Sequence, residues 1–190
     1  MKNIVLFGAP GAGKGTQAVL LKDKYNLIHI STGEVFRYNI KKQTELGKLA
    51  KSYIDKTQLV PDEVTINMLI AEVERFSDAN GFIFDGFPRT RSQAEALDKF
   101  MNDRGHEINA MIVLEVPEDI LIERILSRGL TSGRTNDQSE EKIKIRFQNY
   151  FENTDILKDF YQKQNKYYGI DGVGTVEEIR ERIQQIVDKF

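Results

Sequence analysis

A glycine-rich stretch near the N-terminus constrains the fold of this 190-residue chain more than any other feature. Residues 8–16 read GAPGAGKGT and directly follow the apolar run IVLF at residues 4–7. Glycines let successive backbone N–H groups converge on one anion, and the N-terminus of a following helix adds partial positive charge. The spacing G-x-x-x-x-G-K from Gly8 to Lys14 therefore predicts a strand, a phosphate-binding loop and a helix that begins near Lys14.

One position of this loop departs from the usual pattern. Gly15 occupies the place where serine or threonine is common, and the hydroxyl group comes one residue later, at Thr16. The alternative is a glycine-rich turn that holds no ligand. The strand pattern before the loop and the helix pattern after it favour phosphate binding, with Lys14 reaching the β and γ phosphates of a nucleotide.

Short apolar runs alternate with longer stretches of helical period along the chain. The expected strands cover residues 3–7, 27–30, 81–84, 110–116 and 167–171. Helical spacing is clear at Ile66, Leu69, Ile70, Val73 and Phe76, and again at Val176, Ile179, Ile183, Ile186 and Phe190. Because the strands are apolar throughout and are separated by helices, the pattern predicts an α/β fold of the P-loop NTPase type, with a five-stranded parallel sheet flanked by helices. Ligands of such sheets bind at the carboxyl ends of the strands.

The length and composition indicate a single domain, residues 1–190, with two insertions. These are residues 31–80, between the second and third strands, and a polar loop at residues 129–139. A net charge of -2 does not suggest a nucleic-acid partner. The chain has no cysteine, which excludes disulfides and thiolate zinc sites. The first apolar run is too short for a signal sequence or a membrane span, so a soluble cytoplasmic protein is expected.

A second candidate for a phosphate site is the stretch FIFDGFPR at residues 82–89. Asp85 ends an apolar strand that is expected beside the first strand, so its carboxylate would lie where Mg²⁺ on nucleotide phosphates would be. An Asp-Gly turn that merely ends a strand is the alternative. Next to a phosphate-binding loop, magnesium is the favoured interpretation, and Arg89 points toward the same edge of the sheet.

The arginines indicate the class of reaction. Any one of them could be an ordinary solvated surface residue. Together they could neutralise many phosphate oxygens: Arg37, Arg89, Arg124, Arg128, Arg134 and Arg146. A nucleotide switch or a plain ATPase needs fewer, so the set favours phosphoryl transfer between two anionic nucleotides.

Over essentially its whole length the chain resembles the adenylate kinases in their short-lid form. The resemblance rests on residues 8–16, on Ser31-Thr32-Gly33 with Arg37, on residues 59–62, on residues 85–89 with Gln93, and on residues 128–134. It implies reversible, direct in-line transfer of a phosphoryl group from ATP to AMP, giving two ADP. It also implies Mg²⁺ bound with ATP, Asp85 acting on the metal directly or through water, and a monomer.

The resemblance also implies roles for individual residues. The ATP site would comprise Gly11, Ala12, Gly13, Lys14, Gly15, Thr16, Arg124, Arg128 and the backbone near Gly174. The AMP site would comprise Thr32, Arg37, Gln58, Leu59, Val60, Gly86, Phe87, Pro88, Arg89, Gln93, Arg134 and Arg146. The catalytic set would be Lys14, Arg89, Arg128, Arg134 and Arg146. Residues 31–60 would form a mobile insertion that binds the nucleoside monophosphate, and residues 128–138 a short mobile lid.

Some positions depart from the family pattern. Glu34 and Thr57 stand where aspartate and glycine are more frequent, and Asn136 replaces one of two lid acids. The segment from Asp137 to Arg146 also looks one residue longer than in many relatives. Some long-lid relatives fix the lid with cysteine-bound zinc, but this short lid lacks cysteine, so no zinc is expected.

The choice of acceptor and the choice of function class depend on few residues. Thr32 and Gln93 favour AMP over UMP or CMP, because an amide offers adenine both a donor and an acceptor. Alternatively, Thr32 is only a helix cap and Gln93 only a surface helix residue. A nucleotide-binding regulator without activity is the alternative from another class, and the joint presence of the catalytic lysine and arginines speaks against it. His29 is expected to be a packed or capping residue.

Overall fold

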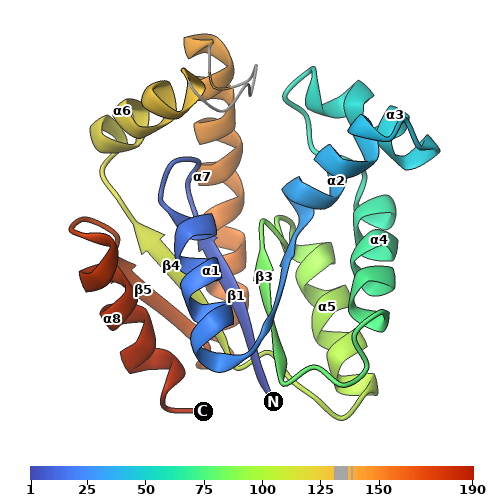
Figure 1. Ribbon diagram of the computed structural model, residues 1–190, viewed down its shortest axis with the longest axis vertical. Coiled ribbons are helices and arrows are strands. Elements are labelled where there is room, and N and C mark those ends of the chain that lie inside the picture. The colour runs from blue at the N-terminus through green and yellow to red at the C-terminus, as the bar shows by residue number, and fades with distance from the viewer. Residues whose placement is uncertain (131–136, 138) are drawn as a thin grey trace.

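The computed structural model describes residues 1–130, 137 and 139–190. Five parallel strands form one sheet in the order β2-β3-β1-β4-β5 (Figure 1). Their bounds are β1 (Lys2–Gly8), β2 (Ile28–Ser31), β3 (Gly81–Asp85), β4 (Ala110–Glu115) and β5 (Tyr167–Asp171). The predicted parallel α/β sheet is confirmed, and β3 lies beside β1 as expected. The predicted strand ends differ from the observed ones by at most one residue.

Helices connect the strands. The described helices are α1 (Lys14–Tyr25), α2 (Thr32–Lys41), α3 (Glu45–Ile54), α4 (Asp62–Glu74), α5 (Arg91–Asp103), α6 (Glu118–Gly129), α7 (Glu140–Gln162) and α8 (Val176–Val187). The predicted helix start at Lys14 is confirmed. Phe76 and Phe190 continue the apolar spacing but lie beyond the ends of α4 and α8. Across the described ranges, the helices are too short or too polar to cross a membrane.

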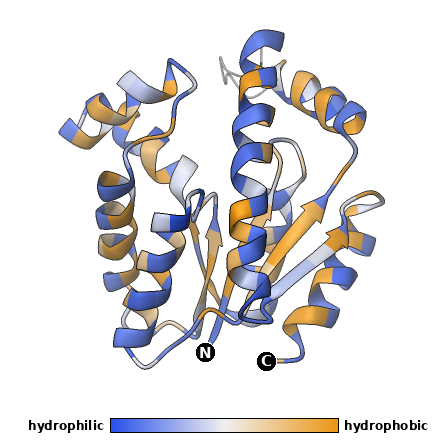
Figure 2. Cartoon of the chain, turned by 180° about the vertical axis from the view of Figure 1, so that it is seen from behind, coloured by the Kyte–Doolittle hydropathy of each residue, from blue (hydrophilic) through white to orange (hydrophobic). Residues whose placement is uncertain are grey.

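Two apolar cores cover the two faces of the sheet. Along β1, Ile4 and Leu6 belong to one core and Val5 and Phe7 to the other, because successive side chains of a strand point to opposite faces. Helices α1 and α8 cover the first face, and α5 with the C-terminal half of α7 covers the second. Figure 2 shows the hydrophobic strands between these helices. This burial on both faces explains why the strands are continuously apolar.

A third apolar cluster lies apart from the sheet. Phe36 from α2, Ala50 from α3, Val60 and Met68 form it. Figure 1 shows α2 and α3 extending beyond the sheet at the end where α6 lies, while α4 runs back alongside α5. Leu69 and Val73 of α4 belong to the second sheet core, so only the first part of the insertion has a core of its own.

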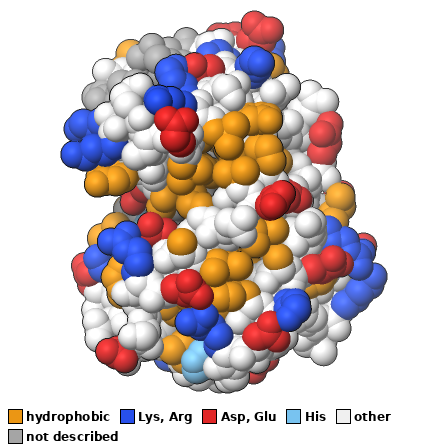
Figure 3. Space-filling model, turned by 90° about the vertical axis from the view of Figure 1, so that its right-hand side faces the viewer, with side chains coloured by type: hydrophobic (Ala, Val, Ile, Leu, Met, Phe, Trp, Pro, Cys, Tyr) orange, Lys and Arg blue, Asp and Glu red, His pale blue; other side chains and the backbone are white. Residues whose placement is uncertain are grey.

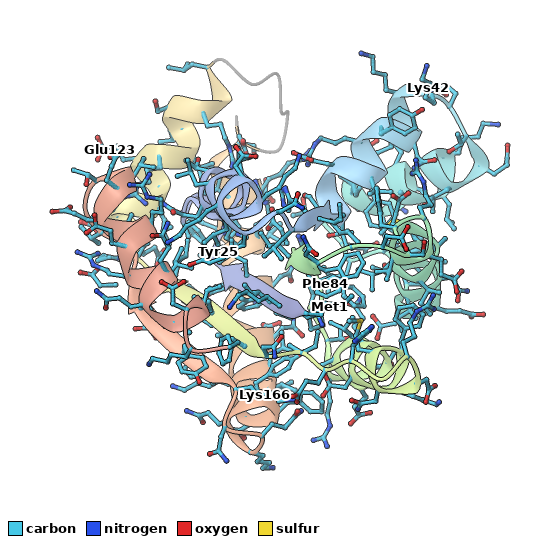
Figure 4. All side chains as sticks on the ribbon, turned by 60° about the horizontal axis from the view of Figure 1, so that its bottom comes forward. Met1, Tyr25, Lys42, Phe84, Glu123 and Lys166 are labelled. Atoms are coloured by element: carbon cyan, nitrogen blue, oxygen red, sulfur yellow. The ribbon has the colours of Figure 1, made fainter. Side chains whose placement is uncertain are left out.

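The face formed by α2 to α5 carries no single sign of charge. Figure 3 shows acidic and basic side chains interspersed on it, with hydrophobic side chains between them. Figure 4 places Lys42 at the outer end of the α2–α3 region, far from Phe84 in the sheet. Ligands of parallel sheets bind at the carboxyl ends of the strands, which is where α1, α2 and α6 begin. The functional residues are therefore expected at this end of the sheet and not on the outer face of α2 to α5.

Candidate active site

The glycine-rich loop is held closely against neighbouring elements. Gly11 has φ 87°, and a Cβ atom there would lie 2.9 Å from Ile125 Cγ1 of α6. Gly13 has φ 96° and precedes the first turn of α1. Without a side chain at Gly13, the N-terminal N–H groups of α1 remain accessible to an anion. The loop thus has the backbone that a phosphate site requires.

Lys14 folds back over this loop. Its Nζ donates to Gly8 O at 2.7 Å and to Ala9 O at 3.2 Å. Burial lowers the pKa of the Lys14 ammonium group to about 8; Asp85 opposes this shift and several cations add to it. These cations are Arg89, Arg146 and Arg128. The structure therefore brings four residues of the predicted catalytic set into one electrostatic environment.

The lowered pKa of Lys14 predicts a pH-dependent affinity for ATP. Phosphates favour the protonated lysine, so above pH 8 the free protein must take up a proton to bind them. The apparent dissociation constant should therefore be about tenfold higher at pH 9 than at pH 7. Calorimetric titration with ATP at both pH values measures this change. A Lys14→Arg variant, which stays charged, should lose most of the change; an equal change in both proteins would contradict the explanation.

Asp85 ends β3 and faces the loop. It pairs in register with Leu6 of β1, and its side chain is 13% exposed. Burial alone would raise the pKa of Asp85, but the neighbouring His29 imidazole and the positive charge of Lys14 outweigh burial and hold this pKa below its ordinary value. His29 Nε2 lies 3.4 Å from Asp85 Oδ2. The expectation that His29 is a packed residue is confirmed. Its contact with Asp85 was not predicted from the sequence.

The segment after Asp85 lies against the start of α2. Thr32 Oγ1 donates to Gly86 O at 3.0 Å, and Arg89 Nε donates to the same oxygen at 2.9 Å. Ser31, not Thr32, occupies the cap position of α2, so the cap interpretation of Thr32 is wrong. Phe87 and Pro88 are buried. The Arg37 guanidinium lies beside Gly33, 2.9 Å from where a Cβ atom would be.

Gln93 is buried rather than on the surface of α5. Its side chain joins two segments, and the residue is 2% exposed. Its Oε1 accepts from Arg89 N at 2.7 Å, and its Nε2 donates to Asp62 Oδ1 at 2.8 Å. The interpretation of Gln93 as a surface residue is therefore wrong.

Thr57 directly precedes Gln58, Leu59 and Val60 and sets the direction of the backbone there. Thr57 has φ 58°, in the left-handed region where glycine is favoured, which explains why glycine is frequent there. Thr57 is 6% exposed, and its hydroxyl has no hydrogen-bond partner in the described ranges. Its carbonyl oxygen accepts from Asn149 Nδ2 of α7 at 3.1 Å.

We expect Thr57→Gly to raise the free energy of unfolding by about 1 kcal/mol. The left-handed conformation costs a β-branched residue roughly 1–2 kcal/mol, and the larger entropy of unfolded glycine offsets part of the gain. Thermal unfolding should show a midpoint about 2–4 °C higher. Lys56→Gly is the matched control, because Lys56 does not have a positive φ. Glycine relieves no strain there, so the midpoint of this variant should fall. A lower midpoint for Thr57→Gly would contradict the strain argument.

Arg128 and Arg146 share one acid that the sequence analysis did not include in the site. Arg128 Nε lies 2.7 Å from Asp137 Oδ2, and Arg146 Nη1 lies 2.6 Å from Asp137 Oδ1. Asp137 is 1% exposed. Burial would raise the pKa of Asp137, but the two arginines hold it below its ordinary value. In the sequence, Asp137 stands among the arginines of the lid region, and this was the signal that could have identified it as their partner. Arg134 lies outside the described residues.

The remaining residues predicted for the ATP site lie on α6 and before α8. An open cavity of about 470 Å³ is lined by Ile120, Glu123, Arg124, Ser127 and Arg128. Arg124 and Arg128 thus share one concave surface of α6; Figure 4 labels Glu123 at this end of the molecule. Gly174, with φ 129°, precedes the capping box of α8 and does not line this cavity.

Comparison with known proteins gives one consistent result. A family model described as "Adenylate kinase" matches residues 6–166. Over all 190 residues of both chains, the sequence is 56% identical to the adenylate kinase of Flavobacterium johnsoniae and 54% identical to that of Flavobacterium psychrophilum. It is 51% identical, again over the full length of both chains, to the adenylate kinase of Bacteroides thetaiotaomicron. With its phosphate-binding loop, its aspartate at the end of β3 and its surrounding arginines, the chain belongs to the adenylate kinase family.

Proposed function

We propose that the chain catalyses reversible phosphoryl transfer from ATP to AMP, giving two ADP. One arrangement carries this proposal beyond family membership: Lys14 lies over the phosphate loop, and Asp137 holds Arg128 and Arg146 together in the electrostatic environment that Lys14 shares with Asp85 and Arg89. A site for transfer between two nucleotides must neutralise phosphates from both sides of the reacting group. This arrangement supplies cations from the phosphate loop, from the β3–α5 segment, from α6 and from α7.

Each part of the site has a role in the proposed reaction. The backbone of residues 11–16 and Lys14 bind the phosphates of ATP, and Arg89 holds the phosphate of AMP in line with them. Arg128 and Arg146, held by Asp137, stabilise charge on the transferred group, with Arg134 added from the lid. The acceptor phosphate is already anionic, so no general base is needed. The site residues act by positioning and by charge stabilisation.

Asp85 fits a role toward magnesium. Its carboxylate has a lowered pKa and lies at the end of β3 beside the loop. In the described part of the chain, no cluster of three metal-ligating side chains exists, which fits a cation held mainly by nucleotide phosphates and water. Bound with ATP, Mg²⁺ would neutralise charge that develops on the phosphates.

Removal of divalent cations should therefore abolish transfer without unfolding the protein. We expect an excess of chelator to reduce ADP formation to the background rate, and added Mg²⁺ to restore it. The thermal midpoint of the nucleotide-free protein should not change, and metal analysis should find no stoichiometric zinc. A chelator that unfolds the free protein would show a structural metal and contradict this proposal.

The proposed function divides the chain into a core, a monophosphate-binding insertion at residues 31–60 and a lid at residues 128–138. The separate apolar cluster around Phe36 supports independent movement of the insertion. Closure over both nucleotides would exclude water, a competing acceptor. We propose a cytoplasmic monomer that closes when both sites are filled. Hydrogen exchange in both segments should slow when a bisubstrate analogue of two adenosines joined by five phosphates binds; unchanged exchange would contradict closure.

An acceptor assay tests the proposed function. ADP formation from ATP is measured with AMP, CMP, UMP or GMP as the second substrate, together with a control that lacks enzyme. We expect AMP to give the highest kcat/KM. A higher value for CMP or UMP would favour a pyrimidine monophosphate kinase, and no activity with any acceptor would favour a nucleotide-binding regulator.

A further inference from the structure

The Gln93 amide is fixed at both of its polar atoms. The backbone N–H of Arg89 donates to Oε1 at 2.7 Å, so the oxygen must face that side. Nε2 donates to Asp62 Oδ1 at 2.8 Å, and a carboxylate can only accept, so the nitrogen must face Asp62. Turning the amide by 180° would place two donors against each other at Arg89 and two acceptors against each other at Asp62.

Asp62 is itself held in place. Thr90 Oγ1 donates to Asp62 Oδ2 at 2.8 Å, which leaves Oδ1 for Gln93. Asp62 begins α4, two residues after Val60, and Arg89 ends the segment at residues 86–89. The amide therefore lies where two stretches that the proposed function assigns to AMP meet. One N–H group and one lone pair of the amide remain for a bound base.

The orientation of an amide decides which base edge it can pair with. Adenine offers an acceptor at N1 beside a donor at the 6-amino group. Hypoxanthine, with the same ring shape, offers a donor at N1 beside an acceptor at the 6-oxo group. A fixed amide can match one of these patterns, whereas a freely turning amide can match both. Cytosine and uracil differ in the same way at position 4.

We propose that Asp62 is a positioning residue that fixes the orientation of the Gln93 amide and thereby selects 6-amino over 6-oxo nucleoside monophosphates. This proposal rests on the proposed function, because it requires the base of the acceptor to lie against Gln93. Asp62 does not contact the base. It acts through Gln93, and its loss removes one of the two contacts that prevent the amide from turning.

The test compares AMP with IMP as acceptors, because they differ in the 6-substituent and not in ring size. The ratio of kcat/KM for AMP to that for IMP is measured on one preparation of each protein, so loss of folded protein cancels. The variants are Asp62→Ala, which removes both carboxylate oxygens, and Asp62→Leu, which keeps a side chain of similar size and offers Gln93 no acceptor. Glu63→Gln is the matched control: Glu63 is exposed and also carries a negative charge in the first turn of α4.

The expected result is a ratio at least about tenfold lower in both Asp62 variants, mainly through a higher KM for AMP, and a ratio within twofold of the wild type in Glu63→Gln. A wild-type ratio in the Asp62 variants would overturn the proposal. An equal fall in Glu63→Gln would also overturn it, because the effect would then come from charge at the helix N-terminus. If the unaltered protein used neither AMP nor IMP but used another monophosphate, the proposed function would fail first.

Discussion

Replacing Lys14 with alanine is expected to lower kcat at least about 100-fold, the scale of losing one preorganised charge contact in a phosphoryl-transfer site. The Lys14 ammonium group lies against the carbonyl oxygens of Gly8 and Ala9 and within the field of three arginines. The ammonium group therefore already lies at the phosphate loop in the nucleotide-free protein. Steady-state kinetics with saturating ATP and AMP measures the loss.

The fold should survive this substitution. Removing an ammonium group from a cluster of cations relieves repulsion, so the thermal midpoint should not fall. Lys22→Ala is the matched control, because Lys22 is exposed on the last turn of the same helix. Its kcat should equal that of the wild type. A folded Lys14→Ala protein with near-normal kcat would remove Lys14 from the catalytic set.

Arg89→Ala is expected to lower kcat/KM for AMP by roughly 100-fold. Arg89 is oriented by the bond from its Nε to Gly86 O, and its backbone N–H binds Gln93. Substitution by alanine removes the guanidinium and keeps the backbone contact. The loss should therefore concern the phosphate of AMP rather than recognition of its base. Initial rates at varied AMP and saturating ATP measure it.

A neighbouring arginine controls for the loss of charge. Arg91 is exposed and pairs with Glu95 on the surface of α5, so Arg91→Ala should leave kcat/KM for AMP within twofold of the wild type. Arg128→Ala should instead impair the use of ATP. If Arg89→Ala raised the KM for ATP and left that for AMP unchanged, the assignment of the two nucleotide sides would be reversed.

The sheet and its phosphate loop could be predicted because their signals are local. The residues of β1 alternate between two apolar cores, so every position from Ile4 to Phe7 is apolar. The loop needs backbone that only glycine adopts easily, as the φ of 87° at Gly11 illustrates. The departure at Thr57 is explained by the same physics, since threonine there adopts the conformation of the more frequent glycine.

Contacts between distant segments could not be predicted in this way. Gln93 stands four residues before Leu97 and eight before Met101 on the buried face of α5, so its burial follows the helical spacing, but its partner Asp62 lies 31 residues away and no local pattern connects the two. Asp137 is not among the site residues that the sequence predicts. Its position between Arg128 and Arg146 depends on how α6 and α7 approach each other. Such pairings follow from the packing of helices and not from local sequence pattern.

The most direct test of the central claim follows the transferred group itself. ATP labelled in its γ-phosphoryl group is incubated with unlabelled AMP, Mg²⁺ and the protein, and the label is located in nucleotides, in inorganic phosphate and on the protein. Direct transfer predicts that the label appears as the β-phosphoryl group of ADP derived from AMP, with two ADP formed for each AMP consumed. Label released mainly as inorganic phosphate, or retained covalently on the protein, would contradict the account.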